Sequence, residues 1–155
     1  MDLLIIISGA KNSKKNLLAM DLASNSDCRW IKPYTDREVP VNQENWEMDE
    51  YVHLTSDLLD KKIVDETVMA SIIVDGDRWV FFESQFDSAF GVIIGDDSVV
   101  SQFRENWNGE LFTIKCHSKD EKYSERSLLK DSEFDAVFCY GRDDYDDLEA
   151  KIVYR

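Results

Sequence analysis

The sequence has few of the residues that interrupt a chain. Its 155 residues include two prolines and six glycines, and they show no internal repeat and no low-complexity linker. No domain boundary is therefore visible. A chain of this length is typical of one domain that is large enough to form a real core, so we expect a single domain over residues 1–155.

Cysteine is also scarce. Cys28, Cys116 and Cys139 are odd in number, and no two of them form a Cys-x-x-Cys pair. This pattern favours a reducing compartment with buried, inert thiols over disulfide bonds or a zinc site. No Ser/His/Asp or Cys/His arrangement stands out, so nothing in the sequence supports hydrolase chemistry.

Long hydrophobic runs are missing. The first apolar run, Leu3 to Ile7, is too short for a signal peptide or a membrane span, and no basic region precedes it. We therefore expect a cytoplasmic protein that does not bind or cross a membrane.

Positive charge is in short supply. The chain has 18 Lys and Arg against 32 Asp and Glu, which gives a formal net charge of −14 at pH 7. Such an acidic surface repels nucleic acid, so we expect no direct nucleic-acid binding. It also raises the alternative of an acidic decoy that occupies a nucleic-acid-binding protein. A hydrophobic content of 43% indicates a folded chain rather than a disordered one.

Short apolar runs without alternation predict strands that are buried on both faces of a parallel sheet. Leu3–Ile7 and Gly91–Gly95 are the clearest runs of this kind. The further strand candidates are Arg29–Lys32, Leu111–Cys116 and Phe134–Tyr140. The helix candidates begin at or near Asn16, Thr55, Ser98 and Asp143. Strands that alternate with helices predict an α/β fold with a parallel central sheet.

A hairpin interrupts this alternation. Asp75-Gly76-Asp77 separates two β-rich runs, Met69–Val74 and Arg78–Phe82, and Asp-Gly between such runs is a strong hairpin signal. We interpret the hairpin as part of a small inserted substructure.

The segment between the first strand and the first helix resembles a phosphate cradle. In such a cradle, backbone N–H groups and a helix N-terminus face an anion, and a lysine adds a positive charge. Against the Walker A pattern G-x-x-x-x-G-K-[ST], Gly9 and Lys15 match, whereas Lys14 replaces the second Gly and Asn16 replaces the Mg²⁺-binding Ser or Thr. A surface loop with two solvated lysines is the alternative.

The order of these elements resembles the guanylate kinase family of nucleoside monophosphate kinases over nearly the whole chain. The matching segments are SGAKNSKKNLL from Ser8, PYTDREVP from Pro33, Glu50-Tyr51, the hairpin, GVIIGDD from Gly91, and Phe134–Ile152. The resemblance implies a three-layer P-loop kinase-like fold. It also implies a monophosphate-binding insert at residues 33–90 and a short lid-like segment at residues 117–131.

The resemblance also implies the site residues. The ATP phosphates would be bound by Gly9, Ala10, Lys11, Asn12, Ser13, Lys14, Lys15 and Asn16. The acceptor monophosphate would be bound by Thr35, Arg37, Tyr51, Asp96 and Asp97. Mg²⁺ would lie near Asn16 and Asp96. The catalytic cations would be Lys15, Arg37 and Arg126, which position and stabilise the transferred phosphoryl group.

Three residues depart from the family pattern around the acceptor. Pro40 replaces the second Arg of the T-T-R-x-x-R segment, Asp36 replaces its second Thr, and Ala70 falls near the Glu that reads guanine. We predict a kinase that transfers the ATP γ-phosphoryl slowly to a nucleoside or deoxynucleoside monophosphate, without strict guanine preference. A weak or inactive kinase-like module that binds a nucleotide or a protein partner is the alternative. For Asp96 and Asp97, capping of the next helix also remains open.

Overall fold

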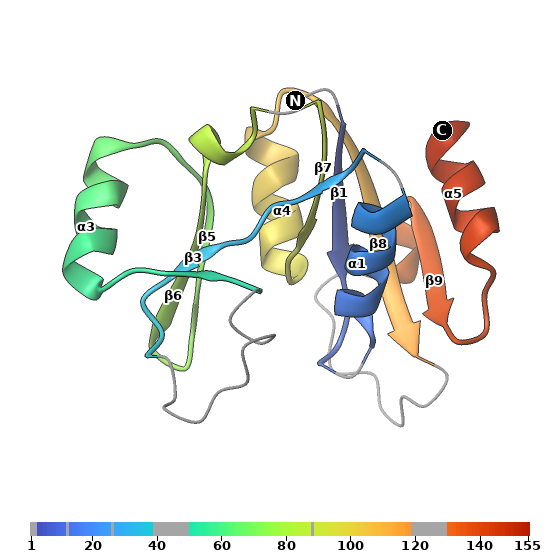
Figure 1. The fold of residues 1–155 in the computed structure, drawn as a ribbon, viewed down its shortest axis with the longest axis horizontal. Helices are drawn as coiled ribbons and strands as arrows, with labels where there is room; N and C mark the ends of the chain where they lie inside the picture. The colour runs from blue at the N-terminus through green and yellow to red at the C-terminus, as the bar shows by residue number, and fades with distance from the viewer. Residues whose placement is uncertain (1–2, 12, 26, 39–49, 88, 119–129) are drawn as a thin grey trace. The chain divides into compact units, whose positions relative to one another are not determined.

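The computed structural model describes residues 3–11, 13–25, 27–38, 50–87, 89–118 and 130–155 (Figure 1). The chain divides into two compact units, which are Met1–Trp30 with Ser88–Arg155 (unit 1) and Ile31–Asp87 (unit 2). Asn12, Pro40 and Arg126 lie outside the described residues. Among the helices in the described segments, none is long and apolar enough to cross a membrane.

Unit 1 contains a five-stranded sheet in which every neighbouring pair of strands is parallel. The strands are β1 (Leu3–Ser8), β2 (Arg29–Trp30), β7 (Phe90–Ile94), β8 (Glu110–Ser118) and β9 (Ala136–Tyr140). Their order is β2-β7-β1-β8-β9, so β1 lies in the middle. All six residues of β1 are buried, as the apolar run predicts for a strand that is covered on both faces.

In the described part of unit 1, this sheet is covered by the helices α1 (Lys15–Asn25), α4 (Asp97–Asn106) and α5 (Tyr145–Val153). Leu18 of α1 and Leu148 of α5 belong to one core cluster. This cluster also contains every second residue of β1, namely Leu3, Ile5 and Ile7. Successive side chains of a strand point to opposite faces, so Ile6 and its alternate neighbours face the other side. Helix α4 contacts β1 and buries an apolar face that includes Phe103. The three-layer α/β prediction is confirmed.

Several strand ends differ from the sequence-based prediction, and β9, for example, begins at Ala136 rather than Phe134. Strand β2 stops at Trp30 rather than Lys32, because it is an edge strand that pairs only through Arg29 and Trp30 with β7. Strand β8 continues to Ser118, because its last residues still pair with β9. His117 and Ser118 therefore belong to the sheet, although the sequence places them in or beside the charged segment. The cysteines are all buried, as predicted, and burial raises the pKa of the Cys28 thiol to about 12.

In its described residues, unit 2 contains a four-stranded sheet of order β4-β3-β6-β5 and one α-helix. Its elements are β3 (Tyr34–Thr35), β4 (Val52–His53), α3 (Ser56–Asp65), β5 (Val68–Val74) and β6 (Asp77–Phe82). The predicted hairpin joins β5 to β6, with positive φ angles of 51° at Asp75 and 83° at Gly76. Both central residues are left-handed, which is the turn that Asp-Gly favours. Thr55 caps α3, as its sequence predicts. Single 3₁₀ turns lie at Glu83–Gln85 and Asp131–Glu133.

A polar network around Asp36 connects the elements of unit 2. The Asp36 carboxylate accepts hydrogen bonds from the backbone amide and the Nε of Arg78, both at 2.9 Å, and from the Ser56 hydroxyl at 3.2 Å. Burial raises the pKa of Asp36, but the hydrogen bonds from Arg78 and Ser56 outweigh it, so the pKa lies below its usual value. Asp36 therefore joins β3 to β6 and to the start of α3.

Asp36→Asn should destabilise the protein in a pH-dependent way. A carboxyl group whose pKa is lower in the folded state stabilises the fold above its unfolded pKa, and this contribution is lost as the pH falls through the folded pKa. We expect the variant to lose about 1–2 kcal/mol near neutral pH and much less near pH 3. Urea denaturation of both proteins at the two pH values measures this. Asp60→Asn, which removes the more exposed carboxylate beside Arg78, is the control with a smaller effect. Equal losses from Asp36→Asn at both pH values would contradict the prediction.

Candidate functional site

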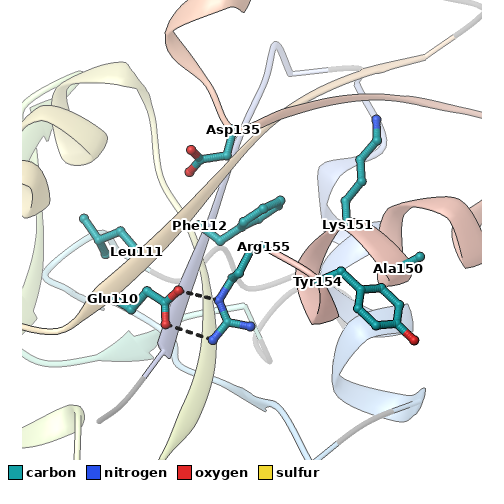
Figure 2. Close-up of a pocket in the computed structure, with 8 residues that line it drawn as sticks. All are labelled: Glu110, Leu111, Phe112, Asp135, Ala150, Lys151, Tyr154 and Arg155. Carbon is teal, nitrogen blue, oxygen red and sulfur yellow. Dashed lines mark hydrogen bonds and ion pairs between the residues drawn. The ribbon is translucent and has the colours of Figure 1, made fainter.

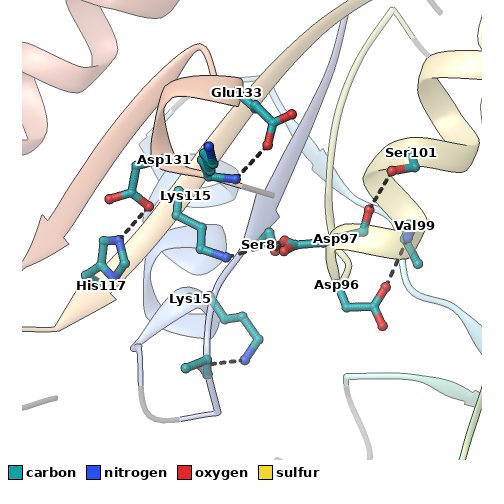
Figure 3. Close-up of polar contacts among 12 residues, drawn as sticks. Ser8, Lys15, Asp96, Asp97, Val99, Ser101, Lys115, His117, Asp131 and Glu133 are labelled. Carbon is teal, nitrogen blue, oxygen red and sulfur yellow. Dashed lines mark hydrogen bonds and ion pairs between the residues drawn. The ribbon is translucent and has the colours of Figure 1, made fainter. Parts of the chain in front are cut away.

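The candidate site is the loop between β1 and α1, at the carboxyl edge of the parallel sheet (Figure 3). Ligands bind at this edge in open α/β sheets. The Ser13 amide donates to the Ala10 carbonyl at 3.0 Å, and the Lys15 ammonium donates to the same carbonyl at 3.0 Å. The loop therefore turns back on itself directly before α1. The first N–H groups of a helix have no partner within the helix, so the loop and the helix together form an anion-binding geometry.

Gly9 allows this loop to lie against β8. A Cβ atom at residue 9 would be 2.5 Å from the Cys116 carbonyl oxygen and 2.5 Å from the Ser13 hydroxyl oxygen. Both distances are too short for real contacts. The Cys116 thiol also donates to the Ser13 carbonyl at 3.2 Å, a second contact between the loop and β8.

Ser13 is the buried polar group that the loop leaves without a partner. Its side chain is fully buried, and its hydroxyl has no hydrogen-bond partner in the described part of the chain. A buried hydroxyl without a partner costs stability. This oxygen lies close to Gly9, since a Cβ atom at residue 9 would be 2.5 Å from it.

Lys14 has the backbone conformation that the second Gly of the Walker pattern would adopt without strain. Its φ is 67°, in the left-handed region that disfavours a residue with a Cβ. Lys11 and Lys14 are exposed, and Lys15 is partly buried. The loop therefore carries three ammonium groups at the start of a helix.

The two carboxylates after β7 have different environments. Asp96 is exposed, and it caps α4 by accepting a hydrogen bond from the Val99 amide at 3.0 Å. Asp97 is buried, with an exposed fraction of 6%. Its Oδ1 accepts from the Ser8 hydroxyl at 2.8 Å and from the Lys115 ammonium at 3.3 Å (Figure 3). The capping alternative therefore describes Asp96, whereas Asp97 belongs to a buried ion pair.

Lys115 was not identified from the sequence as a site residue. It lies on β8 directly opposite Ser8 of β1, and its ammonium is 5.3 Å from the centre of the Phe134 ring. The available signal was a lysine in the mostly apolar run Leu111–Cys116, since a lysine inside a buried strand needs a partner. The identity of that partner was not visible in the local sequence.

Of the residues implied for the acceptor, Thr35, Arg37 and Tyr51 lie in unit 2, whereas Asp96 and Asp97 lie in unit 1. Thr35 is fully buried, and its hydroxyl accepts from the Arg37 amide at 3.1 Å. The Arg37 side chain is exposed, with no side-chain partner among the described residues. Tyr51 is buried and packs edge-on against Trp79, with ring centres 5.5 Å apart. Arg37 is therefore an accessible cation, whereas Thr35 and Tyr51 are mostly enclosed.

The described residues do not fit the Mg²⁺ site that the resemblance implies. The buried carboxylate of Asp97 already contacts an ammonium, Asp96 caps a helix, and Asn16 offers an amide in place of a hydroxyl. No group of three or more His, Cys, Asp or Glu in the described segments could hold a metal ion. Mg²⁺ prefers octahedral oxygen ligands, usually with one or two carboxylates, and this donor set is poor by that measure.

A pocket of about 700 Å³ lies elsewhere in unit 1 (Figure 2). Its lining residues are Glu110, Leu111, Phe112, Asp135, Ala150, Lys151, Tyr154 and Arg155. Glu110 and Arg155 form a two-point ion pair across it, with distances of 2.7 and 2.9 Å. Because Glu110 begins β8, this pocket lies at the amino end of that strand, away from the edge where parallel sheets bind their ligands.

No family model matches this chain, and no curated protein matches it. Among solved structures, it is similar to guanylate kinase from Anaplasma phagocytophilum, with a TM-score of 0.64 and 11% sequence identity. The similarity covers 99% of this chain and 82% of that chain. At this identity the likeness shows the fold alone. The chain has a guanylate kinase-like α/β fold, which confirms the predicted fold class.

Lys14→Gly should stabilise the protein. A left-handed residue with a Cβ costs about 1–2 kcal/mol, part of which glycine gives back through its greater freedom in the unfolded chain. We expect a net gain of about 0.5–1 kcal/mol, measured by urea denaturation. Lys11→Gly removes the same charge from the same loop, and residue 11 does not have a positive φ, so this control should not be stabilising. A Lys14→Gly protein no more stable than the wild type would refute the prediction.

Asp97→Asn and Lys115→Met should each destabilise the protein strongly. Both side chains of the pair are less than a tenth exposed, and removing one partner of a buried pair costs about 3–5 kcal/mol. The double variant should lose much less than the sum, because no buried charge remains unpaired. Denaturation of all four proteins gives the coupling energy. Additive losses would show that the two groups act independently.

Proposed function

We propose that this chain binds the phosphates of ATP with residues 9–16 and a nucleoside or deoxynucleoside monophosphate with unit 2. It would transfer the γ-phosphoryl group to the monophosphate slowly. The observation that supports this proposal most is the loop itself. It combines a helix N-terminus, the Lys15 ammonium and the unpartnered Ser13 hydroxyl at the carboxyl edge of a guanylate kinase-like sheet.

The chemistry of phosphoryl transfer suits such a site. Catalysis rests on positioning the reactants and on stabilising negative charge, and it needs little covalent chemistry from the protein. The loop amides and Lys15 would hold the donor phosphates. Lys15 now donates to the Ala10 carbonyl, a neutral acceptor that a phosphate oxygen would replace. Arg126 would add a further cation near the transferred group, and this role is implied only by the resemblance to the guanylate kinase family.

Arg37 is the best candidate for binding the acceptor phosphate. A guanidinium group grips a phosphate through two parallel hydrogen bonds, and this one is exposed. Asp36, its neighbour, is held by Arg78 and points its charge into unit 2, which lessens the repulsion of a phosphate near Arg37. Ala70 on β5 is buried and has no polar side-chain atom to pair with guanine, so we expect acceptance of other bases.

A nucleotide-binding module without turnover is the second candidate. Lys14 favours it, because a side chain in the left-handed region adds strain where the backbone must approach the phosphates. Small errors of position remove much of the rate advantage of bound reactants, whereas simple binding tolerates them. Turnover therefore separates the two candidates, and ATP binding is common to both.

Calorimetry with Lys15→Met and Arg37→Ala tests the two binding roles. A hydrogen bond to a charged group contributes about 1.5–3 kcal/mol, which is about 10- to 150-fold in affinity. Lys15→Met should lose ATP affinity to that extent, whereas Arg37→Ala should lose monophosphate affinity and keep its ATP affinity. Lys151→Met, an exposed lysine on α5, is the control with no expected effect.

The same proteins in a coupled assay of ATP consumption, with a panel of monophosphates, separate kinase from module. Slow turnover with at least one monophosphate supports the kinase, and binding without turnover supports the module. Unchanged ATP affinity in a folded Lys15→Met protein would remove residues 9–16 from the site.

A further inference from the structure

We infer that the Lys115 ammonium takes the place of a divalent cation beside Asp97, so that this chain binds the phosphates of ATP without Mg²⁺. The inference rests on the proposed phosphate site at residues 9–16, which both candidate functions share. It concerns the ionic form of the nucleotide that the site accepts.

The location of Asp97 is the first step. In phosphate-loop enzymes, Mg²⁺ is held by the Ser or Thr after the loop lysine and by an aspartate from a second segment. In this chain β7 lies beside β1, and Asp97 follows the end of β7. Its carboxylate accepts a hydrogen bond from Ser8, the residue immediately before Gly9. Asp97 is thus an aspartate held at the base of the loop.

The position of Lys115 is the second step. Its Nζ lies 3.3 Å from Oδ1 of Asp97, the same oxygen that Ser8 contacts. The side chains of this pair are 8% and 7% exposed. A magnesium ion would have to displace a buried ammonium, and Mg²⁺ gives up its own water reluctantly. The positive charge beside Asp97 is therefore supplied by the protein itself.

The remaining oxygen donors do not replace Asp97. Asp96 is an exposed carboxylate whose Oδ1 is used to cap α4, and a single carboxylate of this kind holds Mg²⁺ weakly. Asn16 brings a neutral amide to the position where the pattern has a hydroxyl. Neither residue supplies the charge that Asp97 would have contributed.

The charge of the loop is the last step. Lys11, Lys14 and Lys15 stand at the start of α1, and Lys14 adds a charge where the Walker pattern has glycine. A bound divalent cation removes two negative charges from the nucleotide and so weakens its attraction to these ammonium groups. The loop is thus better matched to the metal-free anion than to the magnesium complex.

Calorimetric titration of the wild-type protein with ATP tests the inference directly. One titration contains excess Mg²⁺, and the other contains EDTA at matched ionic strength. We expect the two affinities to agree within about threefold. Tighter binding with Mg²⁺ by more than that factor would overturn the inference and leave the proposed function intact. No ATP binding under either condition would instead overturn the proposed function.

Variants of the pair test the role of Lys115. A folded Lys115→Met protein, checked by thermal unfolding, should bind ATP more than about threefold more tightly with Mg²⁺ than with EDTA, because Asp97 is then open to the metal. Lys115→Arg keeps the cation, and Lys115→Met with Asp97→Asn removes both charges, so neither should depend on Mg²⁺. A folded Lys115→Met protein whose ATP affinity is still independent of Mg²⁺ would overturn the assignment to Lys115. If that variant does not fold, the wild-type comparison decides.

Discussion

The complete burial of β1 is the constraint on which unit 1 depends. The strand is paired with β7 on one side and β8 on the other, and each of its six residues is less than a tenth exposed. Because both faces of β1 are covered, the chain can reach solvent only at the ends of the strand. The exit at Ser8 determines where the loop, the start of α1 and the buried pair behind it must lie. The chemistry of the candidate site follows from a packing requirement of the core.

Local sequence patterns predicted much of this architecture. The run Leu3–Ile7 predicted the central strand, Asp75-Gly76 predicted the hairpin, and Thr55 predicted a helix cap, because in each case neighbouring residues determine the conformation. The Walker pattern also indicated where the loop would lie, and it marked residue 14 as a position suited to glycine. The positive φ of Lys14 is a conformation that glycine adopts without strain, although this residue is a lysine.

Contacts between distant residues were not predictable in the same way. Lys115 and Asp97 are 18 residues apart, and Arg78 and Asp36 are 42 apart. In a chain with a net charge of −14, each cation has many acidic residues within reach, so composition alone does not identify its partner. The pairing is decided by strand order and register, which place Lys115 opposite Ser8 and bring Arg78 to Asp36. The role of Asp36 was hidden for the same reason. The family pattern places this residue beside a phosphate, whereas in the structure it joins the elements of unit 2 through Arg78 and Ser56.

The close approach of Gly9 to β8 has a consequence for how a ligand would be received. Gly9 lies so close to the Cys116 carbonyl that a Cβ atom would clash, and the Cys116 thiol donates to the Ser13 carbonyl, so residues 9 and 13 have little room to move. A binding loop that already has its final conformation loses little conformational entropy when the ligand arrives, and its affinity is correspondingly less reduced by ordering. The contacts of Gly9 and Ser13 with the sheet beneath them would lower this cost for an anion bound at the loop.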